Sequence, residues 1–304
     1  MSSATRLRLA QLLIIVTPAI WSTNYIVARA APGVIEPHLL AFLRWLFAFS
    51  LMLPLAWTEL RQQWPNWIGE WRDLLLLGAL GMWICGAFVY IGGETTEAIN
   101  IGLIYAIAPV LIAVASARLF ADRLRGWQIT GLVMALVGVV FILSRGSLQK
   151  LLAVDFTRGD LWIIVAVLSW TVYSILLRLR PSCLGTFARL TAICGFGLLV
   201  LLPFTAAEWM LTSPPADWPK ALFISAMAGL LPGFGAYQAY SFMQKELGPA
   251  RTGLVLYFGP IYTALIAWWL LAEAPMWFHG VGTLLILPGM YLAMRDPKSR
   301  EPKS

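Results

Sequence analysis

The chain has 304 residues, of which 60% are hydrophobic and only 12% are charged, whereas a typical soluble domain has about 25% charged residues. This composition excludes an ordinary soluble domain and predicts an all-α membrane protein. The formal net charge of +7 comes from Lys and Arg residues scattered through short connections, without the basic helix face or patch of a nucleic-acid-binding protein. We therefore expect the lipid bilayer, and no nucleic acid, as a partner.

Taken in chain order, ten apolar runs each approach the ~20 residues that a helix needs to cross a ~30 Å hydrocarbon core. No small-residue cleavage signal follows the first run, so we expect it to remain in the protein as a helix. The predicted transmembrane helices are residues 9–30, 38–57, 74–92, 98–117, 127–143, 161–177, 185–204, 221–243, 252–271 and 277–294.

The distribution of basic residues predicts the topology. Most of the 22 Lys and Arg residues fall in connections that are cytoplasmic if the chain starts in the cytoplasm, as the positive-inside rule requires. We therefore predict that both termini are cytoplasmic, with residues 295–304 as a short charged tail.

The ten predicted helices divide into two similar halves, residues 9–143 and 161–294. Each half holds five helices, an odd number, so the two repeats must cross the membrane in opposite orientations. The matched positions include Gly102 with Gly253, Pro109 with Pro260, Gly131 with Gly282, and Gly138 with Gly289.

The run from Gly102 to Pro109 and its copy from Gly253 to Pro260 each place a proline within a long apolar segment. Proline has no N–H, so we expect the carbonyls of Tyr105 and Leu256 to lose their helical partners. An unpaired carbonyl is costly in lipid. Helices broken at matching places in two halves point to a central transport site.

No catalytic motif, phosphate-binding loop or metal-ligand spacing is present, so we expect neither an enzyme nor a bound metal or cofactor. His38 and His279 stand at predicted helix starts, and His279 aligns with Gln128, which favours a polar helix-start role. All 15 Asp and Glu residues map to connections or helix ends. The absence of a buried coupling carboxylate favours an uncoupled facilitator, although ion sites made of carbonyls would escape this test.

Arg44 and Arg189 lie inside predicted helices at equivalent places of the two repeats. Either could bind a substrate carboxylate, or its side chain could extend to the nearer lipid headgroups with a buried stem. We favour the headgroup interpretation for both.

Aromatic and polar side chains within the predicted helices form the candidate substrate-binding set. Their rings offer contact area, and their O–H and N–H groups can orient a solute; packing between helices or against lipid is the alternative for each. The set is Trp21, Asn24, Tyr25, Trp83, Tyr90, Tyr105, Trp170, Tyr173, Tyr237, Tyr240 and Tyr257, together with Pro109 and Pro260.

Several of these motifs resemble the EamA repeat of the drug/metabolite transporter superfamily. In the first half they are the run Trp21 to Asn24, Arg44, the run Gly102 to Pro109 and the run Gln128 to Gly138. In the second half they are the runs Trp170 to Tyr173, Gly253 to Pro260 and Gly282 to Gly289. Within the superfamily the chain is similar to the YddG-type bacterial amino acid exporters. The resemblance implies ten helices, cytoplasmic termini, a central cavity and alternating access, with the second-half aromatic residues and both prolines along the path. Ala108 departs from the pattern, because an aromatic residue is expected before Pro109, and a smaller residue there would widen the cavity.

These observations together predict a monomeric, multi-pass protein of the bacterial inner membrane. We expect it to export aromatic and other neutral amino acids and related small metabolites by alternating access, as an uncoupled facilitator. Efflux of drugs or organic cations held by cation–π contacts, export of other metabolites, and proton coupling remain alternatives. A passive channel and an intramembrane enzyme are less favoured classes.

Overall fold

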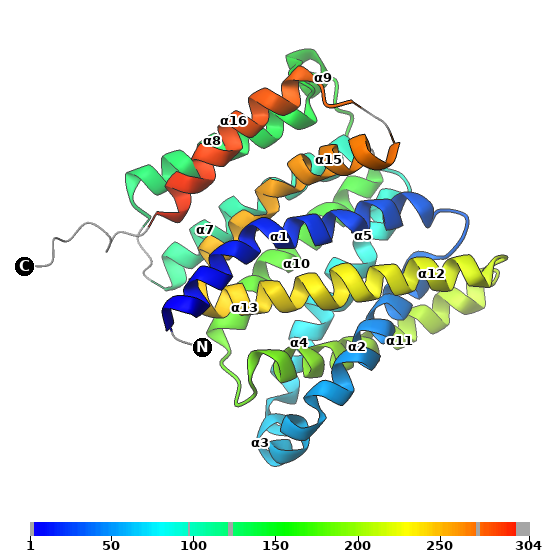
Figure 1. The fold of residues 1–304 in the computed structure, drawn as a ribbon. Coiled ribbons are helices and arrows are strands. Elements are labelled where there is room, and N and C mark those ends of the chain that lie inside the picture. The colour runs from blue at the N-terminus through cyan, green and yellow to red at the C-terminus, as the bar shows by residue number, and fades with distance from the viewer. Residues whose placement is uncertain (1–2, 97, 121–123, 272–273, 296–304) are drawn as a thin grey trace, which may run out of the picture.

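The structure is a computed structural model that describes residues 3–96, 98–120, 124–271 and 274–295 (Figure 1). Within these ranges the chain forms helices and no strands. The α-helices are α1 (Ser3–Ala30), α2 (Pro37–Gln62), α3 (Trp64–Trp67), α4 (Trp71–Gly78), α5 (Cys85–Gly93), α6 (Ala98–Tyr105), α7 (Ala108–Leu119), α8 (Gly126–Leu143), α9 (Leu148–Leu152), α10 (Arg158–Leu179), α11 (Thr186–Leu211), α12 (Trp218–Ala228), α13 (Tyr237–Leu247), α14 (Pro249–Gly253), α15 (Gly259–Leu271) and α16 (Trp277–Met294).

In the part of the chain that the structure describes, eight helical segments are long and apolar enough to cross a membrane. They match eight of the predicted spans. The two remaining predicted spans also form helices, as α1 and as the shorter pieces that end in α15. The all-helical membrane fold is therefore confirmed, while the count of ten spans stays a prediction.

Successive long helices run back and forth through one bundle (Figure 1). We call the end at which α1 begins and α16 ends the terminal end, and the opposite end, where α1 leads into α2, the distal end. At the terminal end Arg6 of α1 donates to Glu246 of α13 over 3.0 Å. Because α1 begins and α16 ends at the same end, the chain crosses the bundle an even number of times.

Both predicted helix breaks are present, but the prolines lie elsewhere in the helix than expected. The first break falls between α6 and α7, and the second is a 3-10 segment, Leu254–Phe258, between α14 and α15. Pro109 and Pro260 therefore sit in the first turns of α7 and α15, where a helix needs no N–H donor. The prediction that the Leu256 carbonyl loses its hydrogen-bond partner is wrong, because the N–H of Gly259 donates to the Leu256 carbonyl.

Two π-helical segments, Ala79–Ile84 and Gly229–Ala236, interrupt the long helices α4–α5 and α12–α13. They occupy corresponding places in the two halves, and nothing in the apolar pattern predicts them. π turns are rare and recur at functional sites. In the first, three successive carbonyls accept side-chain bonds: Leu80 from Ser169 (2.8 Å), Gly81 from Tyr237 (3.1 Å) and Met82 from Trp45 (3.1 Å).

Helices α8 and α16 pack side by side at one edge of the bundle (Figure 1). A Cβ added to Gly138 would lie 2.7 Å from the carbonyl oxygen of Gly282, and one added to Gly289 would lie 2.7 Å from that of Gly131. The lower-numbered glycine of one helix faces the higher-numbered glycine of the other. The two helices are thus antiparallel, and glycines let their backbones approach closely, as in other membrane helix pairs.

Candidate functional site

A cluster of aromatic rings fills the middle of the bundle and joins both halves of the chain. Trp21 of α1 lies 5.6 Å from Trp170 of α10 and 5.4 Å from Tyr240 of α13, between ring centroids. Trp170 also stacks on Tyr173 at 5.4 Å and meets Tyr237 edge-on at 5.5 Å. Such edge-to-face and offset pairs are the favourable arrangements of aromatic rings.

A pocket of about 140 Å³ opens beside this cluster. Five predicted residues line it, namely Trp21, Asn24, Tyr105, Trp170 and Tyr237. The helix breaks contribute as well, because Tyr105 ends α6, while Val255, Leu256 and Gly259 come from the second break. The pocket thus draws on both halves of the chain.

The other predicted residues lie outside the pocket lining. Tyr173 and Tyr240 are buried members of the aromatic cluster, and Tyr90 and Tyr257 are buried in the surrounding core. Trp83 turns away from it and stacks on Phe204 at 3.9 Å. The side chain of Tyr25 lies outside the described part of the chain.

The two prolines and Ala108 also lie outside the pocket lining. Pro109 is buried and Pro260 is partly buried, each beside a break that reaches the pocket through other residues. Ala108 is fully buried without lining the pocket. Any effect of this small residue on the cavity must therefore pass through its neighbours.

Arg44 of α2 lines the pocket and is only 5% exposed. Its Nη1 donates to the Tyr90 hydroxyl over 3.1 Å, and that hydroxyl donates to Asn24 Oδ1 over 2.9 Å. The headgroup interpretation of Arg44 is therefore wrong, because the side chain points into the bundle. The sequence could not separate the two interpretations, since both need an arginine within an apolar helix.

Arg189, the repeat counterpart of Arg44, has a different role. Its Nη1 donates to the Leu177 carbonyl over 2.8 Å, and its Nη2 donates to the Arg180 carbonyl. The guanidinium therefore caps the last turn of α10, where carbonyls lack helical donors and a positive charge is favourable. The equivalence of the two arginines in sequence does not extend to their contacts.

A larger cavity, of about 690 Å³, occupies the terminal end of the bundle. Its wall comes from the end of α10, the start of α11 and the connection between α13 and α14. The charged lining residues are Arg178, Arg189, Lys245, Glu246 and Arg251. Within the described residues this lining is predominantly basic.

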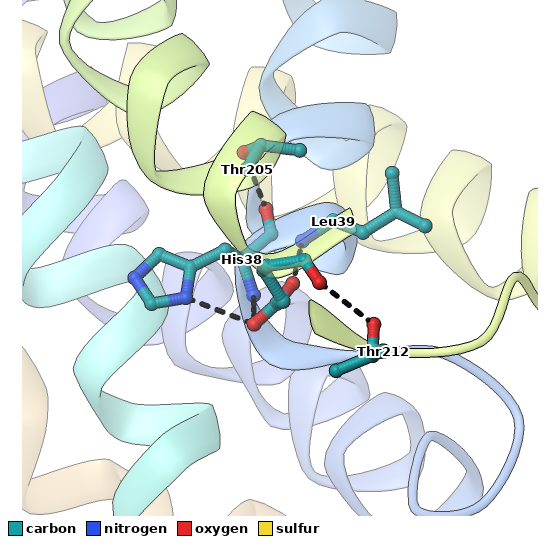
Figure 2. Close-up of polar contacts among 5 residues, drawn as sticks. His38, Leu39, Thr205 and Thr212 are labelled. Atoms are coloured by element: carbon teal, nitrogen blue, oxygen red, sulfur yellow. Dashed lines mark hydrogen bonds and ion pairs between the residues drawn. The ribbon is translucent and has the colours of Figure 1, made fainter. Parts of the chain in front are cut away.

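His38 belongs to a polar cluster at the distal end (Figure 2). The Glu208 carboxylate accepts from the backbone N–H groups of His38 (3.1 Å) and Leu39 (2.9 Å) and lies 2.9 Å from His38 Nδ1. Thr205 donates to the His38 carbonyl over 3.3 Å. Glu208 therefore caps the start of α2, where unpaired N–H groups favour an anion.

The helix-start interpretation of His279 is confirmed. Its Nδ1 accepts from the Met276 N–H over 2.9 Å at the start of α16. Gln128 does the same at the start of α8, where its Oε1 accepts from the Arg125 N–H over 3.0 Å. Two residues that align between the repeats thus make the same capping contact.

Comparison with known proteins places this pocket in a transporter fold. An uncharacterized transporter of Archaeoglobus fulgidus is 25% identical over 290 residues, which cover 92% of this chain and 96% of that protein. An aromatic amino acid exporter, YddG of Ancylobacter novellus, is 25% identical over 302 residues, which cover 96% of this chain and 97% of that protein.

A solved crystal structure superposes with a TM-score of 0.72 at 22% sequence identity, covering 93% of this chain and 96% of that one, and supports the fold alone. The model of the EamA-like transporter family matches the chain twice, at residues 8–144 and 157–295. The chain therefore belongs to the EamA-like transporter family, within the drug/metabolite transporter superfamily, and is similar to the YddG-type exporters.

Proposed function

We propose that this protein exports aromatic and other neutral amino acids, and related small metabolites, across a bacterial inner membrane. The observation that carries the proposal is the central pocket, which combines aromatic walls from both halves with one arginine and one asparagine. Similarity to an aromatic amino acid exporter over nearly the whole chain supports the substrate class.

The proposed arrangement has ten spans in two inverted repeats, residues 9–143 and 161–294, with both termini in the cytoplasm. The even number of crossings and the antiparallel α8–α16 pair support it. The basic lining of the terminal-end cavity supports a cytoplasmic location for that end. In this arrangement substrate enters from the terminal end, and rocking of the repeats exposes the pocket to the distal side.

We also propose that transport is uncoupled and that the protein acts as a monomer. Among the described residues, no carboxylate lines the pocket. Asp160 is buried, but it lies in the first turn of α10, where its Oδ2 accepts from Thr157 N–H (2.7 Å) and Asn100 Nδ2 (3.0 Å). Efflux of organic cations is disfavoured, because the charged side chain in the described lining is itself a cation, Arg44.

Counterflow in proteoliposomes tests the proposal. Vesicles are loaded with one unlabelled amino acid, and entry of its labelled form is followed for aromatic, aliphatic and charged amino acids. Transient accumulation without an ion gradient is expected for neutral amino acids. Uptake that requires an imposed proton or sodium gradient would refute the uncoupled mechanism, and no accumulation for any amino acid would refute the substrate class.

A further inference from the structure

The central pocket contains a buried positive charge with incomplete partners. The Arg44 guanidinium has five N–H donors and stays protonated at any physiological pH. Its contacts are the Tyr90 hydroxyl at 3.1 Å and the face of the Trp45 ring, whose centroid lies 5.0 Å from Cζ. Within the described residues no carboxylate pairs with it, and Nε has no hydrogen-bond partner.

The fold encloses this charge, since Arg44 is only 5% exposed. A Cβ added to Gly229 would lie 2.5 Å from the Arg44 carbonyl oxygen, and one added to Gly233 would lie 3.8 Å from Arg44 Cγ, so the second π segment packs directly on α2 at Arg44. Tyr90, fixed by Asn24, holds one side of the guanidinium. A buried charge without a counter-charge is strongly unfavourable. A ligand that supplies a negative charge would remove this cost.

The pocket around Arg44 suits a small carboxylate. Arginine binds carboxylates through two parallel N–H bonds, which gives both strength and geometric specificity. The rings of Trp21, Trp170 and Tyr237 form an apolar wall of the same pocket. Its volume of about 140 Å³ is well below the about 300–1,000 Å³ typical of sites for drug-sized ligands.

The described pocket lining has no carboxylate to pair with an ammonium ion, which leaves the ammonium only the aromatic faces and the second lone pair of Asn24 Oδ1. Among the described lining residues there is no Asp or Glu, and the Asn24 Oδ1 already accepts from Tyr90. A ligand therefore gains an ion pair through its carboxylate and only weaker contacts, without a counter-charge, through its amine.

We propose that Arg44 binds the carboxylate of the transported solute and that this group, and not the amine, is what the pocket recognises. The proposal rests on the proposed function and deepens it by naming the chemical group that is selected. Small monocarboxylates without an amine should then bind, whereas amines without a carboxylate should not.

Competition in the counterflow assay tests this with the unmodified protein. For labelled phenylalanine the competitors are 3-phenylpropanoate, which keeps the carboxylate, and phenylalaninamide, which keeps the amine. We expect 3-phenylpropanoate to inhibit, and phenylalaninamide to need roughly 10- to 100-fold higher concentration. Equal inhibition by the two compounds, or inhibition by the amide alone, would overturn the proposal.

Variants of Arg44 provide the second arm. Arg44→Gln should raise the KM for phenylalanine roughly 10- to 100-fold, and Arg44→Lys should raise it less, because lysine keeps the charge and loses the paired N–H donors. The matched control is Arg125→Gln, which removes an exposed arginine at the start of α8, away from the pocket. An unchanged KM in Arg44→Gln would overturn the proposal while leaving amino acid export intact.

A binding measurement separates this proposal from the proposed function. If no amino acid shows counterflow, thermal stabilisation of the detergent-solubilised protein by 3-phenylpropanoate is measured instead, since a ligand of the folded state raises Tm. Stabilisation of the unmodified protein and of Arg125→Gln, but not of Arg44→Gln, would support a carboxylate site. Equal stabilisation of all three, or of none, would overturn it.

Discussion

Two buried tyrosines of the core should differ in how loss of the hydroxyl changes the free energy of unfolding. Tyr237 is 4% exposed and donates to the Gly81 carbonyl over 3.1 Å in the first π segment. Tyr257 is fully buried, and its hydroxyl has no hydrogen-bond partner among the described residues. Replacing either by phenylalanine keeps the ring and removes only the oxygen, so the difference between the variants isolates the hydrogen bond.

The expected magnitudes follow from these contacts. Hydrogen bonds between membrane helices contribute about 0.6 kcal/mol on average and at most about 1.7 kcal/mol, and Tyr237→Phe should lower the free energy of unfolding within this range. Tyr257→Phe removes a buried hydroxyl whose unpaired burial costs about 1–3 kcal/mol, so it should be neutral or stabilising. SDS titration of the protein in mixed micelles measures both. A loss in Tyr257→Phe as large as in Tyr237→Phe would refute the reasoning.

Three further predictions follow from the described contacts. In a Cys183→Ser background, which removes the exposed cysteine, a thiol reagent should modify Cys85, which lines the pocket. A transported amino acid should slow this modification, and mass spectrometry measures its rate. An unchanged rate of Cys85 modification would place the substrate elsewhere. Gly282→Leu should lower the free energy of unfolding by several kcal/mol, because a Cβ added there would lie 2.8 Å from the Gly138 carbonyl oxygen. Gly280→Leu on the same helix is the control and should change the free energy of unfolding little, because an added Cβ there would meet nothing within 4 Å. Glu208→Gln should weaken the cap of α2 and lower the free energy of unfolding by about 0.5–2 kcal/mol, as measured by SDS titration. An unchanged free energy of unfolding would mean that the cap does not stabilise the protein.

The sequence predicts the helical membrane fold and the two helix breaks because apolar runs and proline act locally. Five of the predicted substrate-binding residues lie in the described pocket wall, since aromatic and amide groups within apolar helices are few, and their role in binding stays a prediction. Trp83 lies elsewhere, because periodicity alone does not say which side of a helix faces the centre of a bundle. The π segments escape sequence reasoning altogether, because their apolar residues suit an α-helix equally well.

The contrast between Arg44 and Arg189 shows what repeat symmetry can and cannot predict. Duplication places an arginine at matching positions, and His279 and Gln128 show that some matched residues keep the same contact. Arg44 instead lines the pocket and donates to Tyr90, whereas Arg189 donates to carbonyls at the end of α10. Local partners, which differ between the halves, decide each role.

The different roles of the two arginines suit the alternating-access mechanism proposed above, in which one pocket serves two gates. Two equivalent buried arginines would place two like charges in one small cavity, and each would raise the cost of burying the other. With Arg189 at the terminal-end cavity and Arg44 at the centre, a carboxylate can meet one positive group on entry and a second, less exposed one in the pocket. In the proposed mechanism substrate shifts the equilibrium between two open states only by its difference in affinity for them. The hydrogen bonds from Arg44 to Tyr90 and from Tyr90 to Asn24 link α2, α5 and α1 around the Arg44 guanidinium. We therefore expect these two bonds to differ between the two proposed states.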